Sequence, residues 1–206
     1  MPELADRTAP RGLGLILLYS SRLAGVLVSL LFLPLYARLL GQHGFGLAAL
    51  VLTAQALFVM LDLGMAGLLT RDIASQPLAT EARVRWRRAE QLLNLAFVCM
   101  MPMAWLAALV QGWPVGLTLA VTALLWTVTL QNLAQTAMVA RGDVPSAALI
   151  QGVGVLARAG LTALVLWALQ ASLEAFVLSQ LLGALAHLAI NRWWGRRCLP
   201  VPAEGA

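Results

Sequence analysis

The strongest constraint on the fold is a series of long apolar runs separated by short connections. A helix rises about 1.5 Å per residue, so about 20 mostly apolar residues are enough to cross the hydrocarbon core of a bilayer. The runs that reach this length are 13–36, 45–70, 92–110, 115–140, 147–169 and 173–190. Since short connections make consecutive helices antiparallel neighbours, the sequence predicts one all-α membrane bundle of six spans within residues 1–206.

The composition agrees with a protein whose solvent is largely lipid. Hydrophobic residues form 61% of the chain and charged residues only 11%, whereas roughly a quarter of an average soluble sequence is charged. The chain therefore has too few polar side chains to cover a globule in water. The first apolar run is too long for the core of a cleavable signal peptide, so we expect it to remain as the first span.

Several classes of function are not supported by the residues present. The fourteen basic residues are all Arg and lie mostly between apolar runs, which is typical of membrane topology rather than of nucleic-acid binding. Cys99 and Cys198 are too few for a disulfide framework, and His43 and His187 are isolated, so we expect no metal site and no cofactor. The sequence contains no Ser/His/Asp grouping, no phosphate-binding glycine loop and no pair of carboxylates, so it does not predict an enzyme.

The arginines predict the orientation of the bundle. Twelve lie at or near one side, in both terminal segments and in the connections after the second and fourth spans, whereas Arg38 lies alone on the other side. The positive-inside rule therefore places both termini in the cytoplasm. The connection 71–91 carries four arginines between Glu81 and Glu90, and we expect a helical extension at the headgroup level. This extension serves either as a topology anchor or as a docking surface.

Three ionisable residues lie inside the predicted spans, where a charge is costly and usually functional. By helical rise, Arg22 and Asp62 both lie roughly 12–13 Å from the inner face, so they can pair across neighbouring helices. Arg158 lies about 16 Å deep in the fifth span, close to the midplane. Structural explanations stay open, because Arg22 can snorkel to the interface and Asp62 can cap or pair. Arg158 is too deep to snorkel easily, which favours a functional role.

Polar neighbours share helical faces with these charges. Gln55 precedes Asp62 by seven residues and Gln151 precedes Arg158 by the same interval, which is two helical turns. The fourth span carries a polar stripe: Thr118, Thr122, Thr129, Asn132 and Thr136, with Gln131 and Gln135 beside it. Such faces point away from lipid, and they serve either helix–helix hydrogen bonds in a dry bundle or a wetted substrate cavity.

Two motifs give the chain a family resemblance. One is LYARLLGQHGFGL at residues 35–47, and the other is DLG at 62–64 followed by TRDIA at 70–74. They resemble the ends of the first two spans in the O-antigen and exopolysaccharide flippase branch of the multidrug/oligosaccharidyl-lipid/polysaccharide exporter superfamily. The likeness covers about residues 13–192, although Gln42–His43 stands where a Pro is often found.

The resemblance implies flipping of polyprenyl-pyrophosphate-linked oligosaccharide units across the bacterial inner membrane, for cell-surface polysaccharide biosynthesis. Arg22 resembles a cavity arginine of the related peptidoglycan-precursor flippases, and a guanidinium suits a pyrophosphate because it binds phosphate oxygens in a bidentate fork. Asp62 would orient Arg22. Arg158 is included among the expected substrate-binding residues only because of its depth in the membrane. The remaining expected substrate-binding residues are the amides Gln55, Asn132 and Gln151.

Family members usually contain two six-span lobes, and this chain resembles only the N-terminal lobe of such a MATE-like transporter. Alternating access needs two bundles around one site, so the expected partners are a second lobe or a second copy, besides the bilayer and the lipid-linked oligosaccharide. Two other hypotheses stay open. One is a drug or cation antiporter of the same superfamily, although two deep arginines against one aspartate favour an anionic substrate. The other is a truncated membrane protein that does not transport.

Overall fold

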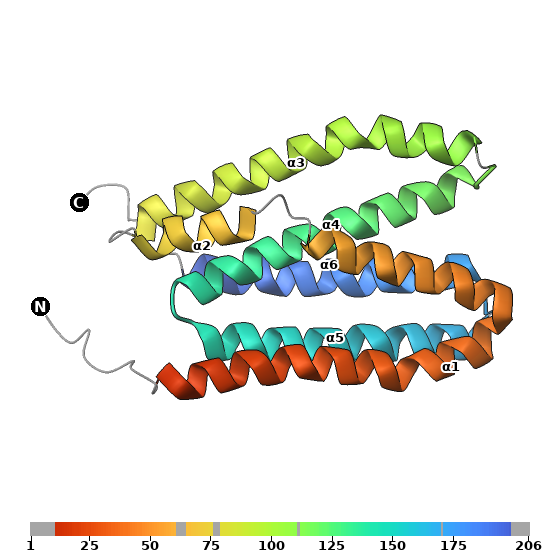
Figure 1. Cartoon of the computed structure of the whole chain (residues 1–206), viewed down its shortest axis with the longest axis horizontal. Helices are drawn as coiled ribbons and strands as arrows, with labels where there is room; N and C mark the ends of the chain where they lie inside the picture. Colours follow the sequence, from red (N-terminus) through yellow and green to blue (C-terminus); the bar gives the residue numbers. More distant parts are fainter. Residues whose placement is uncertain (1–10, 61–64, 76–78, 111, 170, 199–206) are drawn as a thin grey trace, which may run out of the picture.

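The computed structural model describes residues 11–60, 65–75, 79–110, 112–169 and 171–198, and every regular element in these ranges is an α-helix (Figure 1). The helices are α1 (Arg11–Met60), α2 (Met65–Ser75), α3 (Ala79–Val110), α4 (Val115–Ala140), α5 (Val144–Ala168) and α6 (Leu173–Cys198). Five stretches of described helix are long and apolar enough to cross a membrane: Leu30–Met60, Glu81–Val110, Val115–Ala140, Val144–Ala168 and Leu173–Arg197. The prediction of an all-α, multi-pass membrane protein is confirmed.

Helix α1 reverses direction at Gly41. The backbone there has φ +69° and ψ 177°, in a region that is essentially restricted to glycine because a Cβ would clash with the backbone. Figure 1 shows the first arm (residues 11–40) and the second arm (residues 42–60) running in opposite directions. The apolar stretch Leu30–Met60 therefore contains parts of two antiparallel arms, and these arms lie where the first and second spans were predicted.

The other helices follow the predicted runs with extensions at the inner end. Helix α4 has the predicted bounds, and α5 and α6 begin within three residues of theirs. The helical extension predicted within 71–91 is the first part of α3, which is continuous from Ala79. The predicted run 45–70 includes the second arm of α1, described to Met60, and the start of the short helix α2, described from Met65. Residues 61–64 between them lie outside the described part of the chain, and α2 packs against α3 and α4.

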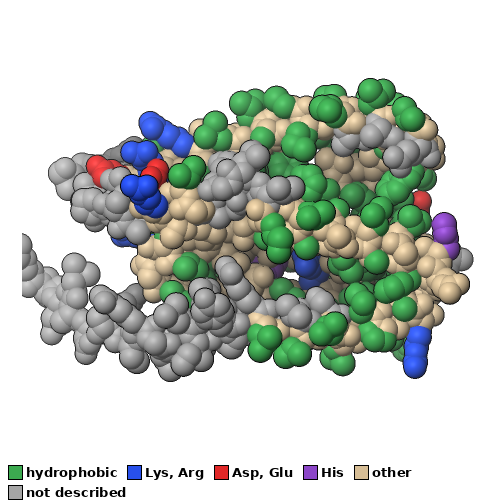
Figure 2. Space-filling model, viewed as in Figure 1, with side chains coloured by type: hydrophobic (Ala, Val, Ile, Leu, Met, Phe, Trp, Pro, Cys, Tyr) green, Lys and Arg blue, Asp and Glu red, His purple; other side chains and the backbone are tan. Residues whose placement is uncertain are grey.

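Charged side chains gather at one end of the bundle, around α2 and the start of α3, whereas hydrophobic side chains cover its length (Figure 2). The starts of α1 and α3, the α4–α5 connection and the end of α6 meet at this end (Figure 1). Two contacts hold α6 there: Arg192 pairs with Glu90 at 3.2 Å, and Trp194 donates a hydrogen bond to Asp143 at 2.8 Å. This end collects the arginines that predict the cytoplasmic side.

Helix α4 is the central element of the bundle. It packs against α6, α3, α2 and α1, and it contributes to both hydrophobic clusters of the core. One cluster joins α2, α3, α4 and α6 around Trp86 and Phe97. The other joins α1, α4, α5 and α6 around Tyr36, Leu124 and Phe176. The polar residues that α4 carries between these clusters are therefore held on a well-packed helix.

Candidate functional site

A cavity of about 480 Å³ with a partly polar lining, called the polar cavity below, lies between the two arms of α1 and helices α4 and α5. Its polar lining residues are Thr53, Gln55, Gln131, Asn132, Gln135, Gln151 and Arg158. The helical faces that carry Gln55, Asn132, Gln151 and Arg158 in the sequence therefore converge on one space. The structure brings together these four predicted site residues from three different helices.

The other two predicted site residues lie outside the described side chains. Arg22 is on the first arm of α1, but its side chain is not part of the description, and Asp62 falls between the described ranges. The pairing of Arg22 with Asp62 therefore stays a prediction.

Four cavity-lining side chains hold a buried polar atom that has no hydrogen-bond partner among the described residues. These atoms are Gln55 Nε2, Gln131 Oε1, Gln151 Oε1 and Arg158 Nη1. A buried polar atom left unsatisfied costs about 1–3 kcal/mol, and native structures contain few of them. Four such atoms around one space mark a part of the bundle where polar side chains are incompletely paired among the described residues.

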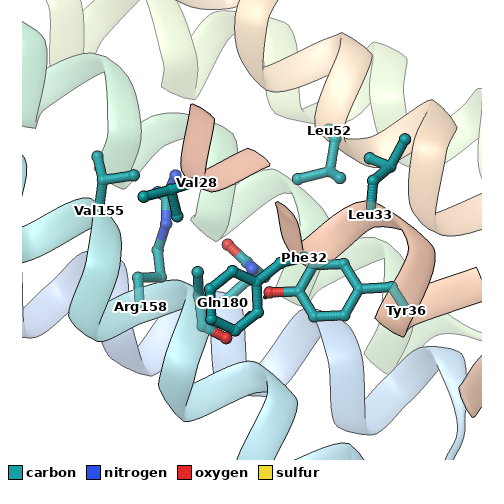
Figure 3. Close-up of a pocket in the computed structure, with 9 residues that line it drawn as sticks. Val28, Phe32, Leu33, Tyr36, Leu52, Val155, Arg158 and Gln180 are labelled. Atoms are coloured by element: carbon teal, nitrogen blue, oxygen red, sulfur yellow. Dashed lines mark hydrogen bonds between the residues drawn. The ribbon is translucent and has the colours of Figure 1, made fainter. Parts of the chain in front are cut away.

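Arg158 is the one charged residue on the described lining of this cavity. It lies fourteen residues after the start of α5 and ten before its end, so it is remote from both ends of the helix. Figure 3 shows the side chain extending from α5 toward Val28 of the first arm of α1. No carboxylate of the described residues lies within salt-bridge distance of it. A guanidinium in this position favours an anion.

Helices α5 and α6 pack closely at two glycines, and each glycine contacts a side chain of the other helix. A Cβ on Gly183 of α6 would lie 2.7 Å from Cγ of Arg158 on α5. A Cβ on Gly154 of α5 would lie 2.6 Å from Nε2 of His187 on α6, and closer still to two other atoms of the ring. Gly154 lies four residues before Arg158 in α5, and Gly183 lies four residues before His187 in α6. The two antiparallel helices therefore present the same spacing to each other in opposite directions. We call this arrangement the reciprocal crossing.

His187 completes the polar group on the α6 side. It is only 3% exposed, and its Nδ1 lies 2.9 Å from Nε2 of Gln131, which lines the polar cavity. An amide nitrogen can only donate, so Nδ1 is the acceptor and a neutral ring carries its proton on Nε2. That Nε2 is buried and has no partner in the described part of the chain. Arg158 and His187 thus each present a buried donor without an acceptor.

A layer of satisfied hydrogen bonds lies next to Arg158 along α5. Tyr36 donates to the carbonyl oxygen of Ala159 at 3.0 Å, and Gln180 donates to the hydroxyl of Thr162 at 3.1 Å. Figure 3 shows the rings of Phe32 and Tyr36 reaching from α1 toward Gln180, around a small cavity of about 40 Å³ that Arg158 also lines. This layer fixes α1, α5 and α6 around the guanidinium.

The threonines of the polar stripe on α4 do not extend the site. The hydroxyls of Thr118, Thr122, Thr129 and Thr136 each donate to the carbonyl oxygen four residues earlier in the same chain. Only Asn132 of the predicted stripe, with the neighbouring Gln131 and Gln135, lines the cavity. The hydrogen-bonding interpretation therefore fits the threonines, and the cavity interpretation fits the amides.

The sequence as a whole matches one family profile, described as polysaccharide biosynthesis protein, over residues 12–204. The chain is a member of this family. The match confirms the resemblance drawn from the two motifs near the ends of the first two predicted spans. No curated protein and no solved structure matches the chain.

Two residues of this polysaccharide biosynthesis protein belong to the site although the sequence analysis did not single them out. His187 has no titratable neighbour in the sequence and was set aside as isolated, and Gln131 was placed only beside the stripe. The spacing of four between Gly154 and Arg158, and between Gly183 and His187, is the signal that identifies the reciprocal crossing. That signal has meaning only once α5 and α6 are known to be antiparallel partners.

Proposed function

We propose that this polysaccharide biosynthesis protein moves oligosaccharide units linked to a polyprenyl pyrophosphate across the bacterial inner membrane, for the assembly of a cell-surface polysaccharide. The observation that carries the proposal is Arg158, a guanidinium far from both helix ends that lines the polar cavity and has no carboxylate partner among the described residues. A charged residue at mid-membrane costs about 2.5–3.5 kcal/mol even on insertion scales. An anionic substrate offsets this cost at the moment it binds.

The proposed roles follow from the chemistry of each side chain. Arg158 binds the pyrophosphate oxygens in a bidentate fork. The amides Gln55, Asn132 and Gln151 meet sugar hydroxyls, because an amide both donates and accepts hydrogen bonds. Arg22 would add a second guanidinium from the first arm of α1, oriented by Asp62.

We further propose that the cavity is closed by a second lobe of similar architecture or by a second copy of the chain. Two rigid bundles that rock about a shared site give alternating access, in the manner of MATE-like transporters. The amide residues Gln55, Gln131 and Gln151 on the cavity lining support an additional polar surface or a substrate on its open side.

Flipping by the purified chain in proteoliposomes tests the proposal. The probe is a fluorescent polyprenyl-pyrophosphate disaccharide, and the readout is the fraction of sugar protected from an external glycosidase. We expect Arg158→Gln to lower the flipping rate at least tenfold, whereas Arg158→Lys keeps the charge but loses the fork and retains an intermediate rate. The matched control is Arg38→Gln, because Arg38 is exposed and lines none of the three cavities that include Arg158.

Unchanged flipping by Arg158→Gln, with the variant still folded, would remove Arg158 from the mechanism and overturn the proposal. If the purified chain flips neither this probe nor related lipid-linked sugars, the result would favour the hypothesis of a membrane protein without transport. The antiporter hypothesis predicts a carboxylate in the cavity, and the described lining residues contain none.

A further inference from the structure

Arginine side chains outnumber carboxylates at the end of the bundle where α2, the start of α3, the α4–α5 connection and the end of α6 meet (Figure 2). Nine described arginines lie at this end, against the four carboxylates of Asp72, Glu81, Glu90 and Asp143. Two of the arginines form salt bridges, Arg85 with Asp72 at 3.4 Å and Arg192 with Glu90 at 3.2 Å. Most of the positive charge here therefore has no salt bridge within the described part of the chain.

Three of these arginines form a group that we call the basic triad: Arg83 and Arg87 of α3 and Arg196 of α6. Arg83 lies close enough to the other two for their like charges to repel its own. Arg83 and Arg87 are also four residues apart on one helix, a spacing at which like charges destabilise. Glu81 makes no salt bridge with any of the three. The triad is a concentration of positive charge without a described counter-charge.

The fold holds the triad together although its members are far apart in the sequence. The indole of Trp86 is buried and reaches α6, where a Cβ on Gly195 would lie 3.0 Å from its Cη2. Arg87 directly follows Trp86, and Arg196 directly follows Gly195. The salt bridge between α3 and α6 described above joins the same two helices. Packing therefore keeps three like charges beside one another, and an anion among them relieves the repulsion.

The surface beyond the triad becomes apolar on both helices. Eleven residues make about three helical turns, so Val98 lies on the side of α3 that carries Arg87. By the same interval, Leu185 lies on the side of α6 that carries Arg196. Val98 is 55% exposed and Leu185 46%, and the exposed Trp193 precedes Arg196 by three residues. Since tryptophan is enriched at membrane–water interfaces, the triad lies where headgroups meet hydrocarbon.

We infer that the basic triad binds the phosphate of an anionic phospholipid, in the leaflet at this end of the bundle, with the acyl chains toward the exposed apolar side chains of α3 and α6. A guanidinium fork matches phosphate oxygens, and clustered arginines at a membrane boundary attract anionic lipids. A free phosphate uses only the polar part of this surface. The inference concerns a site remote from the polar cavity, so it and the proposed flipping can fail independently.

The test measures lipid binding to the purified full chain in zwitterionic micelles by native mass spectrometry, at an ionic strength of about 0.15 M. The probes are dioleoyl phosphatidylglycerol and, as the uncharged comparison, dioleoyl phosphatidylcholine. We expect Arg83→Gln and Arg196→Gln each to weaken phosphatidylglycerol binding about tenfold or more, and to leave phosphatidylcholine binding unchanged. Arg88→Gln is the matched control, because Arg88 is exposed on α3 but lies about 100° around the helix from Arg87. It removes the same charge and should weaken binding less than about threefold.

Each other outcome contradicts the inference. If Arg88→Gln weakens phosphatidylglycerol binding as much as the triad variants, the attraction belongs to the whole basic surface and the triad is not a site. If inorganic phosphate displaces phosphatidylglycerol from the wild type at comparable concentration, the site takes a soluble phosphate and the lipid assignment is wrong. Because the two triad variants lie on different helices, a folding defect in one, seen as lost helicity, leaves the other as the test. Wild-type binding by both variants would overturn the inference.

Discussion

The reciprocal crossing predicts opposite effects for two alanine substitutions only two residues apart on α5. Gly152→Ala should stabilise the protein, because nothing lies within 4 Å of the added Cβ and a helix gains about 0.5–1 kcal/mol when Ala replaces Gly. Gly154→Ala makes the same helical gain, but its Cβ overlaps the ring of His187, which approaches to 2.6 Å at Nε2 and closer at two other atoms. Ordinary contact begins near 3.4 Å, so the ring has to move.

The cost of moving the ring has two parts. Overpacking a tight interior costs about 1–3 kcal/mol, and losing the buried hydrogen bond to Gln131 costs a further 0.5–1.5 kcal/mol, roughly. After subtraction of the helical gain, Gly154→Ala should destabilise the protein by roughly 0.5–4 kcal/mol. Because both variants share the helical gain, they should differ by roughly 1.5–4.5 kcal/mol in free energy of unfolding.

The assay is unfolding in mixed micelles with increasing sodium dodecyl sulfate, followed by helicity. Gly152→Ala provides the matched control for the chemistry of the substitution and for its position on α5. Equal stability of the two variants would refute the packing of His187 against Gly154, and with it the reciprocal crossing.

Two further substitutions test the fold around the site. Gly41→Ala should cost about 1–3 kcal/mol, because φ +69° with ψ 177° is strained for any residue with a Cβ, whereas Gly46→Ala, in an open helical position, should be neutral or stabilising in the same unfolding assay. Trp194→Phe should cost about 1–2 kcal/mol through loss of the hydrogen bond to Asp143, since a bond to a charged acceptor is worth about 1.5–3 kcal/mol. The exposed Trp193→Phe should change stability by less than about 0.5 kcal/mol, and an equal loss from both would contradict a specific role for the Asp143 bond.

The apolar runs predicted the helices well because hydropathy reports directly on contact with lipid. Helix α4 begins and ends at the predicted residues even though it is the most enclosed helix, since it contains no charged residue. The reversal at Gly41 falls in the connection predicted between the runs 13–36 and 45–70, although an apolar window of about 20 residues does not identify which backbone position makes it.

The candidate site was predictable where one helix determines it. Seven-residue intervals place Gln151 and Arg158 on one face of α5, and the structure shows both on the same cavity. The role of His187 depends instead on the register between α5 and α6, which sets Gly154 opposite its ring. Register between helices arises from packing, so the sequence of α6 alone left His187 without a partner.

The distribution of unsatisfied atoms distinguishes a built site from loose packing. On α4 the threonine hydroxyls all find carbonyl acceptors in their own chain, so this bundle readily satisfies polar groups that serve only structure. The described side chains with unpartnered buried atoms are Gln55, Trp86, Gln131, Gln151, Arg158, Gln180, His187 and Asn191. All except Trp86 and Asn191 line a cavity that Arg158 also lines. A carboxylate beside Arg158 would remove the cost of its charge and equally its attraction for a phosphate, so the lack of a carboxylate partner among the described residues fits the proposed binding of an anionic substrate.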